Sequence, residues 1–281
     1  MGEETLTAPP RLSRLYARAV VTARLGGGGA LPDTTLVLAD QVPDPAHVAA
    51  YVRVTGGTLR DRLPTLYPHL LTFGLQVRLL ADRSFPLPLP GLVHLRNTVS
   101  QARPVGTGEA LTLRVHAEEL IAHPKGAQVD LCAVAEVAGE PVWSSRSTYL
   151  ARGAHAAAGV LRPELEVDLP EIPAGVWRLP ADLGRRYAAV SGDVNPIHLN
   201  GLAAKAFGFP RAIAHGMWCK ARALAAIEAR LPAAFTVDVA FRRPVLLPST
   251  VHHVVRQPGD GWDFGLVRPG GYGIHLVGTV R

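Results

Sequence analysis

The apolar residues of this chain follow two patterns, one typical of helices and one typical of strands. Together they predict strands packed around two long helices. Apolar positions recur at helical spacing in residues 66–80 and 216–231. Short runs rich in β-branched residues, bounded by Gly, Pro, Asp or Asn, are typical of strands. Strand-rich segments around a few helices predict the α+β class. The expected strands are residues 34–42, 92–99, 110–118, 128–137 and 142–151 in the first half, and 234–241, 250–255, 262–267 and 273–280 in the second.

The two halves of this pattern repeat each other. Residues 51–57 (YVRVTGG) match residues 187–193 (YAAVSGD) in character, and an Arg-Pro-Val step near residue 104 parallels another near residue 244. In this register Gly57 stands in place of Asp193, and Arg62 in place of His198. The repeat predicts two related units joined in tandem.

The expected division of the chain follows from composition. Residues 1–151 would form the first unit, beginning with a leader of about 30 residues whose Gly26–Gly29 run forms a flexible turn. Residues 152–173 are rich in Ala, Pro and Gly and would form a linker. Residues 174–281 would form the second unit. A chain of 281 residues is long enough for two cores.

The chemistry of the second unit is concentrated in SGDVNPIH, residues 191–198. Pro196 lacks a backbone donor and biases Asn195 away from helix, so the segment predicts a shaped loop. In such a loop the carboxylate of Asp193 and the imidazole of His198 can converge on one water molecule as a general acid–base pair.

Gly216 opens the second apolar helix, in the sequence AHGM. The first N–H groups of a helix have no intrahelical partner and lie at the positive end of its dipole. They would therefore stabilise a carbonyl oxygen that gains negative charge, and a glycine lets that oxygen approach closely. The spacing of the apolar residues predicts that this helix buries one face.

Each of these residues also has a purely structural interpretation. Asp193 could cap a turn, and His198 could be an ordinary buried histidine. Asp193, His198 and His215 could instead hold a metal ion. No tight ligand pair such as H-x-x-x-H or C-x-x-C occurs, so the sequence favours a site without a metal.

The stretch YAAVSGDVNPIHLNGLAAKAFGFPRAIAHGM, residues 187–217, resembles the hydratase signature of the MaoC-like (R)-specific enoyl-thioester hydratase/dehydratase family. FRRPVLLPSTV, residues 241–251, resembles the strand pair that follows the central helix in that family. The resemblance implies a double hotdog, in which each unit wraps a curved antiparallel sheet around a central helix. The first unit would be degenerate and the second catalytic.

The same resemblance implies a reaction and roles. The enzyme would be a hydro-lyase of fatty-acid metabolism that hydrates trans-2-enoyl thioesters to the (R) product or dehydrates (3R)-3-hydroxyacyl thioesters. Asp193 and His198 would activate the water added to C3, and the Gly216 N–H would polarise the thioester carbonyl. No cofactor is implied beyond the coenzyme A or phosphopantetheine of the substrate. Candidate substrate-binding residues beside this pair are Asn195, His215 and Met217.

Charge and composition narrow the partners. The net charge of +6 comes mostly from arginine, but no zinc motif, basic helix or aromatic-interleaved basic strand accompanies it, so nucleic acid is not expected. Coenzyme A phosphates or an acidic acyl carrier protein suit Arg211, Arg242 and Arg243, which could also be ordinary surface arginines. No apolar run reaches the roughly 20 residues of a membrane span, and the start is acidic, so a cytoplasmic protein is expected. A homodimer is an open alternative.

Two other functions remain open from the sequence. A hotdog thioesterase would direct water at the carbonyl carbon, and the full SGDVNPIH pattern argues against it. A non-catalytic acyl-binding subunit should have lost the acid–base pair from both halves, whereas the second half retains it. The preferred chain length and the physiological direction are not encoded in these motifs.

Overall fold

The computed structural model describes residues 2–12, 15, 29–270 and 273–281, and the chain divides into two compact units. The first comprises Met1–Asp44 and Asp61–Pro163, and the second comprises Pro45–Arg60 and Glu164–Arg281. The boundaries differ from those expected, because residues 45–60 pack with the second unit and the linker is shared between the two. Most of the expected glycine turn, residues 26–28, lies outside the described residues.

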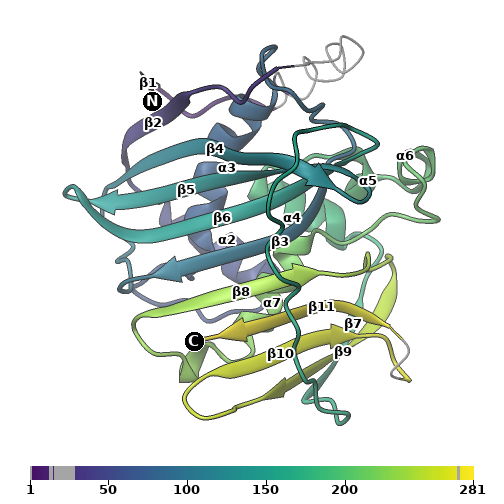
Figure 1. Cartoon of the computed structure of the whole chain (residues 1–281). Helices are drawn as coiled ribbons and strands as arrows, with labels where there is room; N and C mark the ends of the chain where they lie inside the picture. The colour runs from purple at the N-terminus through teal and green to yellow at the C-terminus, as the bar shows by residue number, and fades with distance from the viewer. Residues whose placement is uncertain (1, 13–14, 16–28, 271–272) are drawn as a thin grey trace. The chain divides into compact units, whose positions relative to one another are not determined.

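The first unit is a sheet with a helix packed against one face. Its strand order is β1-β2-β4-β5-β6-β3; β1 pairs parallel with β2, and the other pairs are antiparallel. Helix α3 contacts β4 and β5 (Figure 1). Alternate residues of β4, such as Leu111, Leu113 and Val115, are fully buried. The elements are β1 (Gly2–Thr5), β2 (Thr34–Gln41), α3 (Tyr67–Leu80), β3 (Val93–Gln101), β4 (Leu111–His123), β5 (Gly126–Val137) and β6 (Glu140–Arg152).

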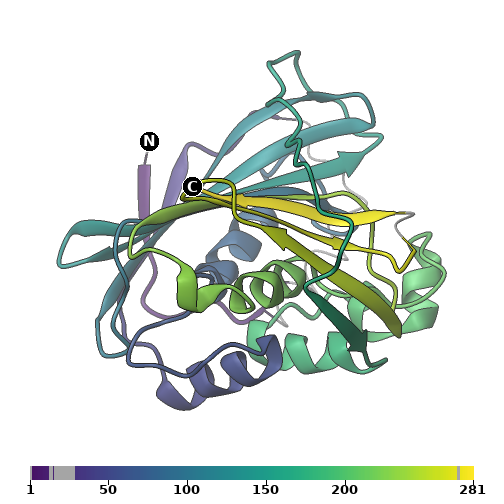
Figure 2. The same ribbon diagram turned by 90° about the horizontal axis from the view of Figure 1, so that it is seen from below.

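The second unit has the strand order β8-β11-β10-β9-β7, with every pair antiparallel. Helix α7 contacts β10 and lies beneath the C-terminal strands in Figure 2. It is buried on almost every side, so the expectation of one buried face was wrong: α7 is the central helix. The elements are α2 (Pro45–Thr55), β7 (Gly175–Leu179), α4 (Leu183–Ser191), α5 (Pro196–Leu199), α6 (Gly201–Ala206), α7 (Gly216–Ala225), the 3₁₀ turn η1 (Glu228–Arg230), β8 (Phe235–Phe241), β9 (Ser249–Arg256), β10 (Trp262–Val267) and β11 (Ile274–Val280).

The structure supports the internal repeat. If β2–β6 are matched in turn with β7–β11, the two units have the same strand order, apart from β1, which has no counterpart in the second unit. The helices of the repeated motif also end alike. Helix α2 is followed by Gly56 and α4 by Gly192, with left-handed φ values of 69° and 70°. This conformation suits glycine, because it has no Cβ.

The linker has no helix or strand between residues 153 and 174, as expected, but specific contacts fix its course. Arg96 donates to the Pro163 carbonyl oxygen at 2.8 Å within the first unit. In the second unit, Arg242 pairs with Glu164 at 2.8 Å. Each of these arginines therefore holds its part of the linker within its own unit. No helix among the described residues is long and apolar enough to cross a membrane.

Candidate active site

The Asp193 carboxylate is held by a short turn after α4. Gly192 reverses the chain, and the Ser191 hydroxyl oxygen accepts a hydrogen bond from the Asp193 N–H at 3.2 Å. The Asp193 Oδ1 atom in turn accepts from the Asn195 N–H at 3.2 Å. The other carboxylate oxygen, Oδ2, lies 3.8 Å from Nε2 of His215.

His198 lies on a one-turn helix, not in the loop that the sequence predicted. Asn195 caps this helix, because its side-chain oxygen accepts from the Ile197 N–H. Pro196 occupies the first turn, where a missing N–H costs little. Asn195 thus orients both members of the expected pair, through its backbone to Asp193 and through its side chain to the helix of His198.

The protonation state of His198 follows from its surroundings. Its Nδ1 lies 2.8 Å from the Ile213 carbonyl oxygen, which can only accept, so Nδ1 carries the hydrogen. The ring is buried, and burial lowers the pKa of His198 although the nearby Asp193 raises it. His198 is therefore neutral at pH 7, with an unprotonated Nε2.

His215 packs directly against this pair. Its ring stacks on that of His198, with centroids 3.7 Å apart, and its Nε2 donates to the backbone oxygen of Asp193 at 3.0 Å. Burial lowers the pKa of His215 to about 3, with a further contribution from His198. The residue is 2% exposed, and its contacts position the Asp193–His198 pair; that His215 also binds substrate stays a prediction.

One ligating atom each from Asp193, His198 and His215 lies within 4.8 Å of the others. This spacing suits a carboxylate and an imidazole acting on one water molecule. It would also suit a metal ion. However, carbonyl oxygens engage Nδ1 of His198 and Nε2 of His215, so a metal would have to bind the opposite ring nitrogens.

Helix α7 begins at Gly216, with His215 as its N-cap. The segment before it is fixed by bonds from the Ile213 N–H to the Ile197 oxygen and from the Ala214 N–H to the Val245 oxygen. A Cβ at position 216 would lie 3.0 to 3.3 Å from ring atoms of Phe241. Glycine therefore keeps the helix N-terminus uncrowded, where its first N–H groups have no intrahelical acceptor.

The other expected binding residues are three arginines and Met217. Arg211, Arg242 and Arg243 are exposed, and Arg242 pairs with Glu164. Met217 is buried in α7.

The sequence reasoning missed three residues that shape the site. They are Ser191, which holds the Asp193 turn; Phe241, beside Gly216; and Tyr187, whose ring centroid is 4.9 Å from that of His215. Ser191 and Tyr187 belong to the quoted motif, and Tyr187 also has a repeat counterpart in Tyr51. Burial raises the pKa of Tyr187 well above 10, so the hydroxyl is neutral. The match between Tyr187 and Tyr51 in the internal repeat is the sequence feature that could have identified this tyrosine.

The chain is similar in sequence and fold to known proteins. The family model for the MaoC-like domain matches residues 163–262. The chain is 41% identical to 3-hydroxyacyl-thioester dehydratase X of Mycobacterium tuberculosis over 89% of this chain and 90% of that protein. The crystal structure of M. tuberculosis HtdX superposes with a TM-score of 0.79 at 39% identity, covering 88% of this chain and 99% of that one. A MaoC-like dehydratase from Phytophthora capsici shares the fold, with a TM-score of 0.72 at 19% identity over 89% and 95% of the two chains. The chain therefore belongs to the MaoC-like dehydratase family.

Proposed function

We propose that this chain is a hydro-lyase that interconverts trans-2-enoyl thioesters and (3R)-3-hydroxyacyl thioesters in fatty-acid metabolism. The observation that carries the proposal is the cluster of Asp193 and a neutral His198 in the same unit as the glycine N-terminus of α7. The 41% identity to a 3-hydroxyacyl-thioester dehydratase supports the same reaction.

In the hydration direction, the Nε2 of His198 takes a proton from water as the water oxygen bonds to C3. Asp193 accepts the other hydrogen of that water and fixes its orientation. The π electrons move toward the thioester oxygen, where the Gly216 N–H and the α7 dipole stabilise the negative charge. Collapse of this enolate takes up at C2 the proton that His198 Nε2 removed from the water, so His198 returns to its neutral state, one water is consumed and no net proton is released. Dehydration reverses these steps.

The acyl group of the substrate is bound as a thioester to coenzyme A or to the phosphopantetheine of an acyl carrier protein. The proposed chemistry needs no further cofactor and no metal. Arg211 and Arg243 are exposed on the same unit and suit the phosphates of coenzyme A or phosphopantetheine. Arg242 is already paired with Glu164, so it is the weakest of the three candidates.

The direct test is a coupled assay of the purified protein on trans-2-enoyl-CoA of several chain lengths, with separate detection of (R)- and (S)-3-hydroxyacyl-CoA. We expect the (R) product alone, and its loss in Asp193→Asn. Absence of hydration with both coenzyme A and carrier-linked substrates would refute the proposal. Release of free thiol without formation of a 3-hydroxyacyl product would instead identify a thioesterase.

A further inference from the structure

A second cluster of ligand side chains lies on the sheet of the first unit, and the proposed reaction does not use it. His116 and Glu118 are two residues apart on β4, so both side chains project from the same face. Cys132 on β5 is the direct cross-strand partner of His116. One ligating atom from each of the three residues lies within 4.8 Å of the others, and His116 Nε2 is 2.7 Å from Glu118 Oε1.

We propose that His116, Glu118 and Cys132 bind a Zn²⁺ ion that links β4 to β5. One imidazole nitrogen, one carboxylate oxygen and one thiolate sulfur form a donor set that zinc accepts, with water completing a tetrahedron. The strand register already brings these atoms together, so binding needs side-chain rotation and no change of backbone.

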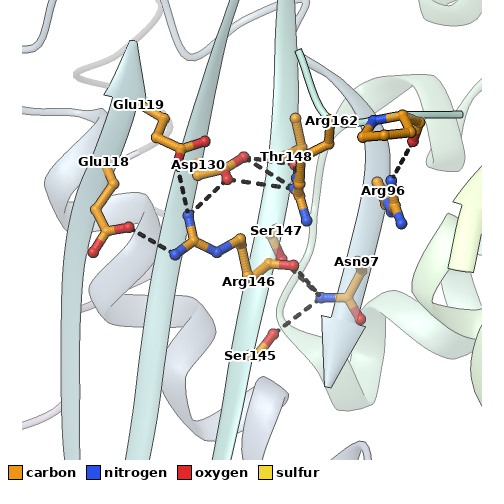
Figure 3. Close-up of polar contacts among 11 residues, drawn as sticks. Arg96, Asn97, Glu118, Glu119, Asp130, Ser145, Arg146, Ser147, Thr148 and Arg162 are labelled. Carbon is orange, nitrogen blue, oxygen red and sulfur yellow. Dashed lines mark hydrogen bonds and ion pairs between the residues drawn. The ribbon is translucent and has the colours of Figure 1, made fainter. Parts of the chain in front are cut away.

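The neighbouring residues resemble the outer shell of a metal site. Figure 3 shows Glu118 turned toward Arg146, whose Nη2 lies 2.8 Å from Glu118 Oε2, which leaves Oε1 directed at His116. Arg146 also donates to the buried Asp130 at 2.9 Å. Thr148 and Arg162 both hold Asp130, the hydroxyl of Thr148 at 2.6 Å. A ligating carboxylate held in this way is typical of metal sites.

The charges of this cluster leave room for a divalent cation. The carboxylates of Glu118, Glu119 and Asp130 face two guanidinium groups, those of Arg146 and Arg162. The pairing of β4 is interrupted by a bulge after Glu118, and Glu119 also faces the guanidinium group of Arg146. With a Cys132 thiolate the cluster would carry two more negative charges than positive ones, and Zn²⁺ would neutralise the difference.

Binding must remove the thiol proton. Burial raises the pKa of Cys132 to about 12, so the metal-free side chain is a neutral thiol. Formation of the Zn–S bond breaks the S–H bond and releases the proton to solvent. The Glu118 carboxylate can only accept, so His116 Nε2 carries the ring hydrogen in the metal-free protein, and this hydrogen moves to Nδ1 when Nε2 binds the metal. The apparent affinity should therefore rise about tenfold per pH unit near neutrality.

Cobalt provides a probe specific for the thiolate. Co²⁺ added to chelator-treated full-length protein should produce a thiolate-to-metal charge-transfer band that saturates at one equivalent and that Zn²⁺ abolishes. The chain has two cysteines, Cys132 and Cys219, so Cys219→Ser is the matched control. We expect Cys132→Ser to lose the band and Cys219→Ser to retain it. Asp193, His198 and His215 offer no thiolate, so metal bound there cannot produce this signal.

Two further variants guard against a folding artefact. Glu118→Gln should weaken Zn²⁺ binding strongly, and Arg162→Ala, which removes only an outer contact, should weaken it about tenfold. Zn²⁺ should raise the Tm of the wild type and of Cys219→Ser, but not that of Cys132→Ser. Absence of a charge-transfer band in the wild type, or a band that survives in Cys132→Ser, would overturn the proposal. Neither the charge-transfer band nor the Tm depends on hydratase activity, so failure of this proposal is distinguishable from failure of the proposed function.

Discussion

At the residue scale, the candidate site depends on which side-chain atoms already form hydrogen bonds to the backbone. The Ile213 oxygen fixes the tautomer of His198, and the Asn195 N–H fixes one oxygen of Asp193. The Oδ2 atom of Asp193 lies 3.8 Å from Nε2 of His215. The pair is therefore preorganised by main-chain groups that sequence patterns do not reveal.

Removal of either group should cost most of the activity. We expect Asp193→Asn and His198→Ala each to lower kcat at least about 100-fold, because general acid–base groups contribute on that scale. Asn can still accept from the Asn195 N–H, so the turn should survive. The measurement is steady-state hydration of an enoyl thioester, with circular dichroism as the folding control.

The double variant tests whether the two residues act together. If they share one water molecule, Asp193→Asn/His198→Ala should be little slower than the slower single variant. Multiplication of the two losses would show separate roles and contradict the proposed mechanism.

His215 predicts a pH dependence of stability. Its pKa falls from 6.5 to about 3 on folding, so between these values the unfolded chain binds more protons than the folded one. Stability should therefore be lost as the pH falls from 6.5 toward 3, by up to about 1.4 kcal/mol per pH unit. His215→Gln, which does not titrate, should flatten this slope in urea unfolding experiments. His198 and His253 also have lowered pKa values and contribute in the same direction, so part of the slope should remain. An unchanged slope would mean that His215 is solvated or already charged in the folded protein.

At the element scale, the site depends on how closely α4 approaches α5. A Cβ built on Gly184 of α4 collides with the backbone oxygen of His198. Backbone cannot move aside as a side chain can, so glycine is required at this crossing.

Gly184→Ala should displace α5 and with it the catalytic imidazole. We expect a loss of about 1 to 3 kcal/mol of stability, as for overpacked cores, together with a large fall in kcat. Gly201→Ala is the matched control, because the nearest atom to its Cβ is 4.0 Å away. Chemical denaturation and kinetics of both variants would decide the matter, and equal behaviour of the two would rule out this contact as the constraint.

The elements that the sequence predicted and those it missed differ in the strength of their local pattern. The strands with long β-branched runs were found, and β10 was found with its bounds, residues 262–267. The strands β1 (GEET) and β7 (GVWRL) are short and lack such runs. Helix α5 has only four residues, so its helical turn depends on a cap and a proline and not on periodicity.

The same distinction applies to the candidate site. The sequence identified Asp193, His198 and Gly216 because their residue types and spacing carry the chemistry. It could not show that the ring of His215 would lie on that of His198, since that contact depends on tertiary packing. Nor could it place residues 45–60 in the second unit, because their local pattern says nothing of which core they join.

At the scale of the whole molecule, two units of equal strand order have diverged in chemistry. Arg62 stands at the repeat position of His198 and is exposed. We expect Arg62→Ala to change kcat/KM less than about twofold, since ordinary surface substitutions have small effects. The same assay on His198→Ala gives the contrast. A large loss in Arg62→Ala would show that the first half contributes to catalysis or binding.

Restoring the acid–base residues to the first half should not restore the reaction. In a His198→Ala background, Gly57→Asp with Arg62→His would place the same residue types at the repeat positions in the sequence, but the helix that follows them lacks what α7 supplies. Helix α3 begins with Tyr67 and Pro68, so a bulky ring stands at its first position and the next residue has no N–H. Without that donor and without glycine's open approach, the enolate oxygen would lose the stabilisation that α7 provides in the second half. We therefore expect no (R)-hydration above the His198→Ala background, measured at high enzyme concentration. Recovery of turnover would show that the carboxylate and imidazole suffice, and that the helix N-terminus is dispensable in this family member.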